Sequence, residues 1–288
     1  MDFPLAAKTA AVRKYRTPMS TAALNRDEID DAACWLVAAR LDGRSASACP
    51  LAPHLATEEN GYTVQAAGHR ILAEEGFGRL VGYKVGCTNQ AVQDLLAVPG
   101  PAYGGILAAD LHWGEAEIAR GPLQRPGIEC EIAFWINRPP EPAESPYDRD
   151  SIRPCVAACS AAMEIVDNRY GDFRDVPFGL MIADDFFHSA AIVGSPVAAW
   201  QDLDLAALAG TTLVNGQAAG TGTGANVLGD PLEALAWLAN RLISQDKTLQ
   251  GGQVVLTGTM VDPVWLDADA LQAAIEVEKL GKVTAYLT

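Results

Sequence analysis

The spacing of apolar residues predicts helices at the start of the chain. Across residues 25–41, alanine, isoleucine, leucine and valine recur every three or four positions, as in an amphipathic helix. Asn25 is suited to cap its first turn, and Gly43 follows its end. A second helix is predicted over residues 62–75, with Gly76 closing it. The N-terminal part is therefore expected to be mainly helical.

After residue 78 the pattern changes to short apolar runs typical of strands. We expect a flexible tail over residues 1–20, a helical region over 21–78 and a strand-rich main domain over 79–288. Residues 79–86 are predicted to form a strand, because they are rich in valine and glycine. A short helix is expected from Thr88 through Leu96, followed by a turn-rich loop over PGPAYGG (99–105).

Strict alternation over residues 128–137 predicts a strand with one apolar face, and it places Glu129 and Glu131 together on the other face. Residues 162–168 predict another strand, in which Glu164 stands between apolar neighbours. A helix that begins at Asp150 is predicted to contain Ile152, Val156 and Cys159. A hairpin is predicted at Asn215-Gly216, followed by a helix that Asp230 caps, with Glu233 in its first turn, and that runs to about Ser244. Strands are predicted over 253–259, 273–280 and 282–288.

Composition narrows the classes of partner. The 288 residues are 49% hydrophobic and 20% charged, which suits a globular protein with a buried core. With 36 acidic and 21 basic residues the net charge is −15, so nucleic acid and anionic membranes are not expected as partners. An anionic small molecule would need a metal ion or local cations in its pocket.

Cysteines and hydropathy indicate a reducing compartment. The six cysteines are scattered through apolar stretches, so we expect reduced thiols, mostly buried, rather than disulfides. Cys155 and Cys159 have no second pair at zinc spacing, which disfavours a zinc site. No signal peptide is apparent, and no apolar run reaches the roughly 18 residues that span a bilayer. A cytoplasmic protein is therefore expected.

Three glutamates are the candidate metal ligands. On a strand, the Cα atoms of Glu129 and Glu131 are expected to lie about 6.5 Å apart with both side chains on one face, a spacing that suits two oxygen ligands of one hard cation. The alternative is an ordinary solvated face of an edge strand. Glu164, in an apolar strand, needs a positive partner, which is either the same cation or Arg169.

Other polar residues in apolar surroundings are candidates for catalysis. Lys84 either extends to the surface or lies near an anion in a cleft. Asp184, Asp185 and His188 either position a catalytic water or satisfy backbone groups of a loop. The residues alone leave both alternatives open.

Together these motifs resemble the 2-keto-4-pentenoate hydratase and 2-oxo-3-hexenedioate decarboxylase group of the fumarylacetoacetate hydrolase superfamily. The resemblance covers residues 25–288. The motifs that carry it are GYTVQ (61–65), VGYKVGCTNQAVQDLL (81–96), PGIECEIAF (126–134), AMEIVDNRYGDF (162–173), IADD (182–185), VLGDPLEALAWLANRL (227–242) and VVLTGT (254–259).

The resemblance implies an α+β fold with a mixed β-roll core and a small helical N-terminal region. It also implies a magnesium or manganese ion held by Glu129, Glu131 and Glu164, with Lys84 beside the substrate, and assembly into homo-oligomers. Such a cation stabilises the enolate of a bound 2-oxo acid, which serves both hydratases and decarboxylases in aromatic-compound catabolism. Further assigned roles are catalysis by Asp184 and His188, and substrate binding by Arg169, Thr257 and Thr259.

Two departures from the family pattern affect the expected reaction. Related hydratases carry an acid/base aspartate where this chain has Ala102, which disfavours ordinary hydration. Phe186 and Phe187 replace small residues and should narrow the pocket, and His188 is a candidate for the missing proton carrier. The main hypothesis is a metal-dependent lyase acting on a small 2-oxo or 2-hydroxy unsaturated acid. The alternatives are a hydrolase of acylpyruvates using His188 or His69, and a non-catalytic relative.

Overall fold

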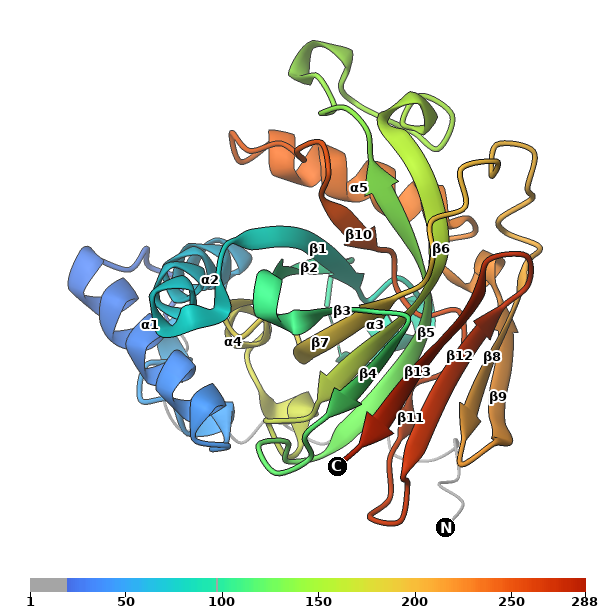
Figure 1. Cartoon of the computed structure of the whole chain (residues 1–288). Coiled ribbons are helices and arrows are strands. Elements are labelled where there is room, and N and C mark those ends of the chain that lie inside the picture. Colours follow the sequence, from blue (N-terminus) through green and yellow to red (C-terminus); the bar gives the residue numbers. More distant parts are fainter. Residues whose placement is uncertain (1–19, 97) are drawn as a thin grey trace.

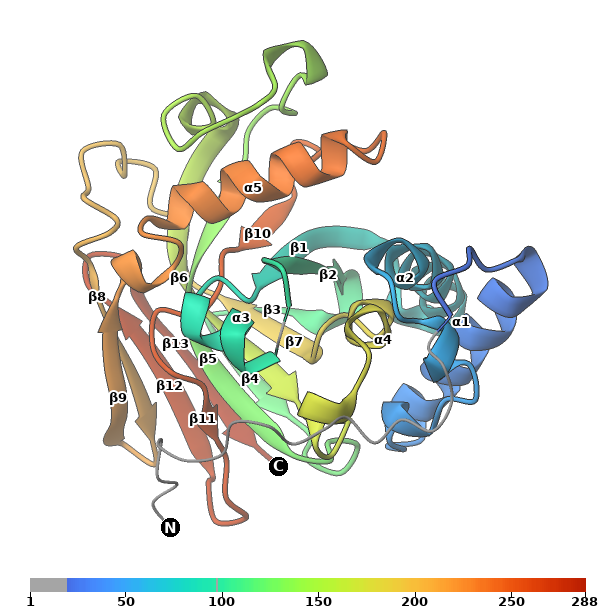
Figure 2. The same ribbon diagram turned by 180° about the vertical axis from the view of Figure 1, so that it is seen from behind.

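The computed structural model describes residues 20–96 and 98–288, so the predicted tail lies almost entirely outside the described residues. Two curved sheets pack face to face, and helices cover one side and one end (Figures 1 and 2). The helices are α1 (Arg26–Leu41), α2 (Glu58–Leu72), α3 (Gln90–Leu96), α4 (Phe178–Ala183) and α5 (Pro231–Ile243), and a π-helical turn (Ala73–Phe77) follows α2.

The larger sheet has eight strands in the order β2-β1-β10-β5-β6-β7-β3, with β11 paired to β5. Its strands are β1 (Leu80–Gly86), β2 (Ala102–Leu107), β3 (Leu111–Trp113), β5 (Pro126–Ile136), β6 (Val156–Asp167), β7 (His188–Val193), β10 (Val254–Leu256) and β11 (Val264–Trp265). The smaller sheet has the order β4-β13-β12-β8-β9, formed by β4 (Glu115–Ile118), β8 (Ala209–Val214), β9 (Gln217–Thr223), β12 (Gln272–Val277) and β13 (Gly281–Leu287).

The main core lies between the two sheets. The apolar face of β5, from Ile128 to Ile136, is at most 3% exposed and belongs to one cluster with Ile275 and Val283 of the smaller sheet. Both sheets mix parallel and antiparallel pairs. The predicted α+β class, with a rolled mixed-sheet core and a helical N-terminal region, is confirmed.

The predicted N-terminal helices are also confirmed. Asn25 caps α1 through a reciprocal pair of hydrogen bonds with Glu28, and Gly43 has a φ of 63°. The second helix begins earlier than predicted, because the Thr57 side chain caps it, and Gly76 beyond its end has a φ of 97°. The domain boundary at residue 79 stays a prediction.

Two predicted elements were wrong. The proposed loop contains β2, in which the glycines serve close packing: a Cβ on Gly104 would lie 2.6 Å from the Asp185 carbonyl oxygen. The proposed helix from Asp150 is a single turn (Arg153–Cys155) followed by β6, which is buried on both faces and therefore lacks the alternation of a half-exposed strand. Cys155 and Cys159 are thus not on one helix.

The C-terminal predictions hold with adjusted ends. Asn215 and Gly216 have φ values of 49° and 77°, as a type I′ hairpin requires, and Asp230 caps α5 by accepting from Leu232 N. β10 ends at Leu256, earlier than predicted, and α3 begins at Gln90, two residues after Thr88. No helix in the described chain is long and apolar enough to cross a bilayer.

Candidate metal centre and active-site cavity

Three strand-borne glutamates converge on one point. Glu129 and Glu131 share one face of β5, and the antiparallel register places Glu164 of β6 directly opposite Glu129. One carboxylate oxygen from each lies within 4.8 Å of the others. Glu131 and Glu164 are fully buried, whereas Glu129 is partly exposed and lines a cavity. Their role as metal ligands stays a prediction.

The oxygen atoms of the triad suit a hard cation. Glu131 Oε2 accepts a hydrogen bond from the Gly258 amide at 2.6 Å, while Glu131 Oε1 and Glu164 Oε2 are buried without a hydrogen-bond partner. Burial, and then Glu164, raise the pKa of Glu129 to about 7, and the same causes raise the pKa of Glu131 well above its usual value. A divalent cation would satisfy the unpaired oxygens and compensate the repulsion between the carboxylates.

Lys84 points into the site and not to the surface. Its side chain is 2% exposed, and its amine lies 3.2 Å from Glu164 Oε1 and donates to the Phe186 carbonyl at 2.5 Å. Burial lowers the pKa of Lys84, but the charges of Glu164, Glu129 and Glu131 outweigh burial and raise it. Lys84 therefore remains a cation. The alternative of a surface-extended lysine is excluded.

His188, at the start of β7, contacts the triad through Glu164. Its Nδ1 lies 2.8 Å from Glu164 Oε1, and its Nε2 is buried without a hydrogen-bond partner. Burial raises the pKa of Glu164, but Lys84 and the hydrogen bond from His188 outweigh it and hold that pKa below its usual value. His188 is fully buried and does not line the cavity.

Arg169 pairs with Asp184, not with Glu164 as one alternative had it. Its Nε donates to Asp184 Oδ2 at 2.8 Å, and its other nitrogens donate to the His188 and Asp184 carbonyls. Arg169 therefore joins the two ends of the segment that carries Phe186. Neither Arg169 nor Asp184 lines the cavity, so their assigned roles at the substrate stay predictions.

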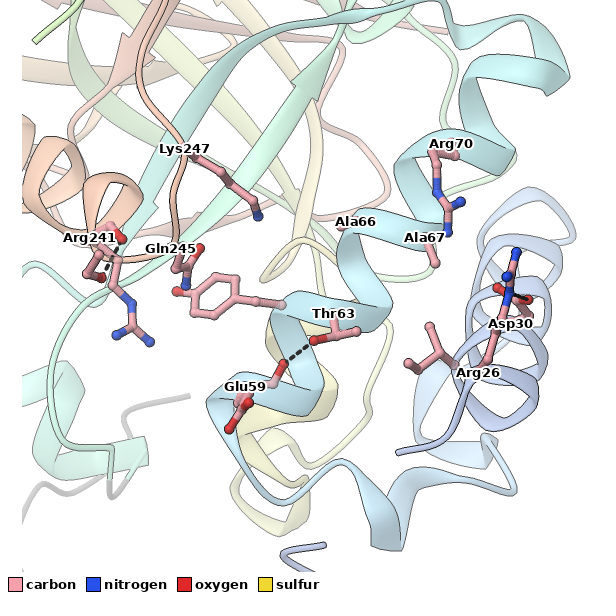
Figure 3. Close-up of a pocket in the computed structure, with 13 residues that line it drawn as sticks. Arg26, Asp30, Glu59, Thr63, Ala66, Ala67, Arg70, Arg241, Gln245 and Lys247 are labelled. Carbon is pink, nitrogen blue, oxygen red and sulfur yellow. Dashed lines mark hydrogen bonds and ion pairs between the residues drawn. The ribbon is translucent and has the colours of Figure 1, made fainter. Parts of the chain in front are cut away.

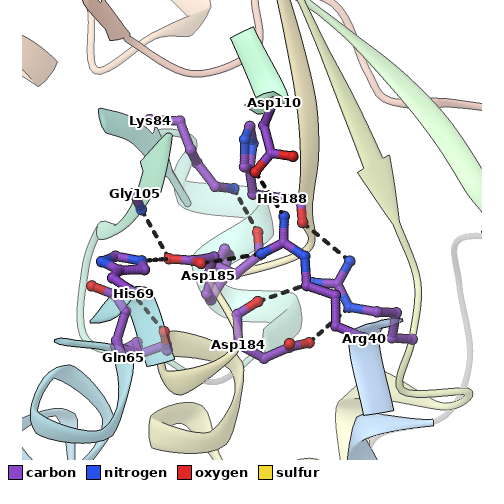
Figure 4. A network of polar contacts seen from close by, with 12 residues as sticks. Arg40, Gln65, His69, Lys84, Gly105, Asp110, Asp184, Asp185 and His188 are labelled. Atoms are coloured by element: carbon purple, nitrogen blue, oxygen red, sulfur yellow. Dashed lines mark hydrogen bonds and ion pairs between the residues drawn. The ribbon is translucent and has the colours of Figure 1, made fainter. Parts of the chain in front are cut away.

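Asp185 organises a second buried network, shown in Figure 4. It accepts from the Gly105 amide at 2.9 Å and lies 2.7 Å from His69 Nε2 and 3.3 Å from Arg40 Nη1. Arg40 also pairs with Asp110. Although burial acts in the opposite direction, His69 and Arg40 hold the pKa of Asp185 far below its usual range. This network joins α1 and α2 to the segment before β7.

Two threonines follow β10 near the triad. The fully buried Thr257 hydroxyl donates to the Ile132 carbonyl at 2.9 Å, and Thr257 does not line the cavity. The Thr259 hydroxyl donates to the Val261 carbonyl, and Thr259 does line it. Of the two predicted substrate-binding threonines, Thr259 is the one beside the cavity, and both roles stay predictions.

The cavity above the triad has a volume of about 230 Å³. Sequence reasoning singled out Lys84, Glu129, Thr259 and the phenylalanine pair, but it missed the residues that come from α3, β11 and the segment after β6. The Pro-Val-Trp sequence at residues 263–265 was the signal that could have indicated Trp265. The lining residues are Lys84, Val85, Gly86, Cys87, Thr88, Asn89, Val92, Leu96, Glu129, Val166, Phe173, Phe186, Phe187, Gly258, Thr259, Pro263 and Trp265.

A wider cleft of about 800 Å³ lies among α1, α2 and the end of α5 (Figure 3). Its lining includes positively charged side chains, such as Arg70 and Lys247, and negatively charged ones, such as Asp30 and Glu59. It shares no lining residue with the cavity above the triad, and none of the three glutamates lines it.

Comparison with known proteins agrees with these features. The family model for the C-terminal part of fumarylacetoacetate hydrolase matches residues 90–288. A 2-keto-4-pentenoate hydratase from Burkholderia vietnamiensis is 35% identical over 265 residues, covering 90% of this chain and 99% of the relative. A second, 2-keto-4-pentenoate hydratase 1 from Dechloromonas aromatica, is 34% identical over 270 residues, covering 93% and 99%.

The solved structures include 4-oxalocrotonate decarboxylase from Pseudomonas putida G7, complexed with magnesium and adipate. It aligns with a TM-score of 0.83 and 25% identity over 92% of this chain and 99% of that chain. Hydratases and a decarboxylase thus match nearly the whole length. The chain therefore belongs to the fumarylacetoacetate hydrolase family, in the group of the 2-keto-4-pentenoate hydratases and related decarboxylases, and is an enzyme of the lyase type.

Proposed function

We propose that Glu129, Glu131 and Glu164 hold one magnesium or manganese ion, and that a small 2-oxo or 2-hydroxy unsaturated acid binds beside them in the cavity. The observation that carries this proposal is the convergence of three carboxylates, two of them with unpaired buried oxygens, beside the cavity that Glu129 lines. An all-oxygen ligand set favours these hard cations over zinc. The magnesium complex of the Pseudomonas relative supports the choice.

When bound, such an ion withdraws electron density from a chelated keto acid and stabilises its enolate. The protein's own residues prepare the site for that charge. Lys84, held cationic by the three glutamates, is the group within the cavity that attracts the substrate carboxylate or the developing enolate. His188 orients Glu164 through its Nδ1 contact, and the Thr259 hydroxyl borders the bound acid.

Asp184 and Arg169 act on the site indirectly in this proposal. Their ion pair, at 2.8 Å and almost fully buried, fixes the segment that carries Phe186 and Phe187 along the cavity wall. This placement supports a positioning role for Asp184, Arg169 and His188, in place of direct contact with substrate.

The geometry favours a lyase over a hydrolase of acylpyruvates. Hydrolysis of a carbon–carbon bond requires a general base that activates water, and His69 and His188 were its candidates. Neither histidine lines the cavity: His69 lies 2.7 Å from Asp185, and His188 Nδ1 lies 2.8 Å from Glu164 Oε1. Ala102, which is fully buried on β2, does not line it either.

Product identification tests the proposal. The full chain, loaded with magnesium, is incubated with 2-hydroxydienoates, 2-oxo-3-enedioates and acylpyruvates, and the masses of the products are measured by mass spectrometry. We expect water addition or loss of carbon dioxide with the first two classes, and none after metal is removed by chelator. Undiminished turnover in Glu131→Gln would contradict the metal centre, and release of pyruvate from acylpyruvates would favour the hydrolase. Glu276→Gln, on an exposed strand position, is the matched control.

We also propose a homo-oligomer located in the cytoplasm. Trp113 is 57% exposed and stacks on Trp135 with ring centroids 4.9 Å apart, a surface that suits contact with a second copy. All six cysteines are free, as expected in a reducing compartment. Sedimentation of the full chain, compared with Trp113→Ser, tests the assembly; a monomer at micromolar concentration would contradict it.

A further inference from the structure

We propose that the cavity selects a monocarboxylic substrate whose end remote from the keto acid is an alkyl or aryl group. This inference rests on the proposed function, because Lys84 and the glutamates must bind the keto-acid end. Lys84 and Glu129 are the charged residues of the described lining, and both lie at that end. The rest of the wall is largely apolar.

The strand register gives the cavity its direction. Gly127 lies opposite Val166. This pair is two residues along β5 and β6 from the Glu129–Glu164 pair, a distance of about 6.5–7 Å along the strands. Trp265 of β11 pairs with Gly127 on its other side. A Cβ on Gly127 would lie 2.9 Å from the Trp265 ring and 3.2 Å from Val166, so these two side chains close over the glycine. The cavity therefore runs from carboxylates to an apolar wall.

Phenylalanines extend that wall. The Phe186 ring lies 5.3 Å from the Lys84 amine, and Phe187 packs edge-on against Phe186 and Phe173. Asp185, Phe186 and Phe187 all have φ values between 51° and 69°, a left-handed conformation that is costly for such residues. Three consecutive residues in this conformation, held by the Lys84 bond to the Phe186 carbonyl, indicate that the ring positions are maintained for the site.

Among the described residues, no cation lines the apolar end of the cavity to pair with a second carboxylate. Arg125 stacks on the Trp265 ring at 5.1 Å and Arg174 is paired with Asp172, and neither lines the cavity in the described part of the chain. Burying an unpaired carboxylate there is unfavourable. Since loss of carbon dioxide from the far end requires a carboxylate at that end, an apolar end also disfavours decarboxylation.

A matched pair of unreactive ligands tests the selection. The magnesium-loaded full chain is titrated calorimetrically with 2-oxohexanoate and 2-oxoadipate, which have equal chain length and differ in a terminal methyl against a carboxylate. We expect the monoacid to bind at least about tenfold more tightly. Equal affinities, or tighter binding of 2-oxoadipate, would overturn the inference. Pyruvate, which has no tail, reports on the keto-acid end alone, so failure of pyruvate to bind indicates failure of the proposed function instead.

A charge introduced at the apolar end should reverse the preference. Phe173 is half-buried and lines the apolar end, so Phe173→Arg should bind 2-oxoadipate more tightly than 2-oxohexanoate, while the affinity for pyruvate, which does not reach that end, stays unchanged. Leu271→Arg, at a residue 70% exposed on the surface, adds the same charge away from the cavity and should leave all three affinities unchanged. An unchanged preference in folded Phe173→Arg contradicts the assignment of this end.

Discussion

Glu129 on β5 lies directly opposite Glu164 on β6. Because side chains alternate along a strand, this pairing places Glu131 on the same face, and a slip of one residue would turn Glu164 to the other face. The back face of β5, including Ile128 and Ile132, is fully buried against the second sheet, which holds the register in place. The convergence of the three glutamates is therefore a consequence of core packing.

Glu131→Gln should separate metal binding from folding. The glutamine keeps an oxygen for the Gly258 amide but removes one charge from a repulsive cluster, so the metal-free variant should melt at or above the parent's temperature. Magnesium at about 100 times its Kd stabilises the parent by about 2.7 kcal/mol. Thermal melts with and without magnesium should show that this gain is lost in the variant, and not in Glu276→Gln.

Lys84→Met should uncouple binding of the acid from binding of the metal. The three carboxylates remain and lose a positive neighbour, so magnesium should bind at least as tightly as in the parent. Turnover should fall by about 10²–10³-fold, because charge stabilisation in the cavity is lost. Calorimetry with magnesium and kinetics with the identified substrate check both effects. Lys282→Met, at an exposed residue, is the control, and parent-like turnover in Lys84→Met would remove the assigned role.

Gly258→Ala should disturb the site through backbone geometry. Gly258 has a φ of 100°, and a Cβ there would lie 2.2 Å from the Thr88 hydroxyl oxygen, so the amide that holds Glu131 must move. The strain is expected to cost about 1–3 kcal/mol, together with weaker magnesium binding. Gly216→Ala also has positive φ, at 77°, but no atom within 4 Å of the new Cβ. Urea unfolding should show strain in both variants, whereas magnesium titration should differ only for Gly258→Ala.

Asp185→Asn should show a pH-dependent loss of stability. The folded-state pKa of Asp185 is far below its unfolded value near 3.9, so its stabilising contribution is complete above about pH 5 and declines as the pH falls below 4. Asparagine tolerates the positive φ, and removal of the charge leaves Arg40 and His69 without their shared partner. We expect a loss of about 3–5 kcal/mol at neutral pH. Urea unfolding across pH 3 to 7 measures it, and a pH-independent difference would contradict the charge assignment.

Local patterns predicted the elements whose residue types carry a clear signal. Apolar residues alternate with glutamates along β5, and Asn25 marks the start of a helix with an exposed face. The prediction failed where the residues of a buried strand are uniformly small and apolar, or where glycine serves packing. β6 is buried on both faces, so its small apolar residues carry no period, and Gly104 of β2 makes room for the Asp185 backbone in place of a turn.

By itself the sequence determined the three glutamates as candidate ligands, the apolar core and the family resemblance, because residue type and spacing along one strand are local properties. Only the tertiary structure decided that Glu164 meets Glu129, that Arg169 pairs with Asp184, and that His188 contacts Glu164 without lining the cavity. The physical reason is that strand register and the direction of buried side chains follow from packing between segments far apart in sequence.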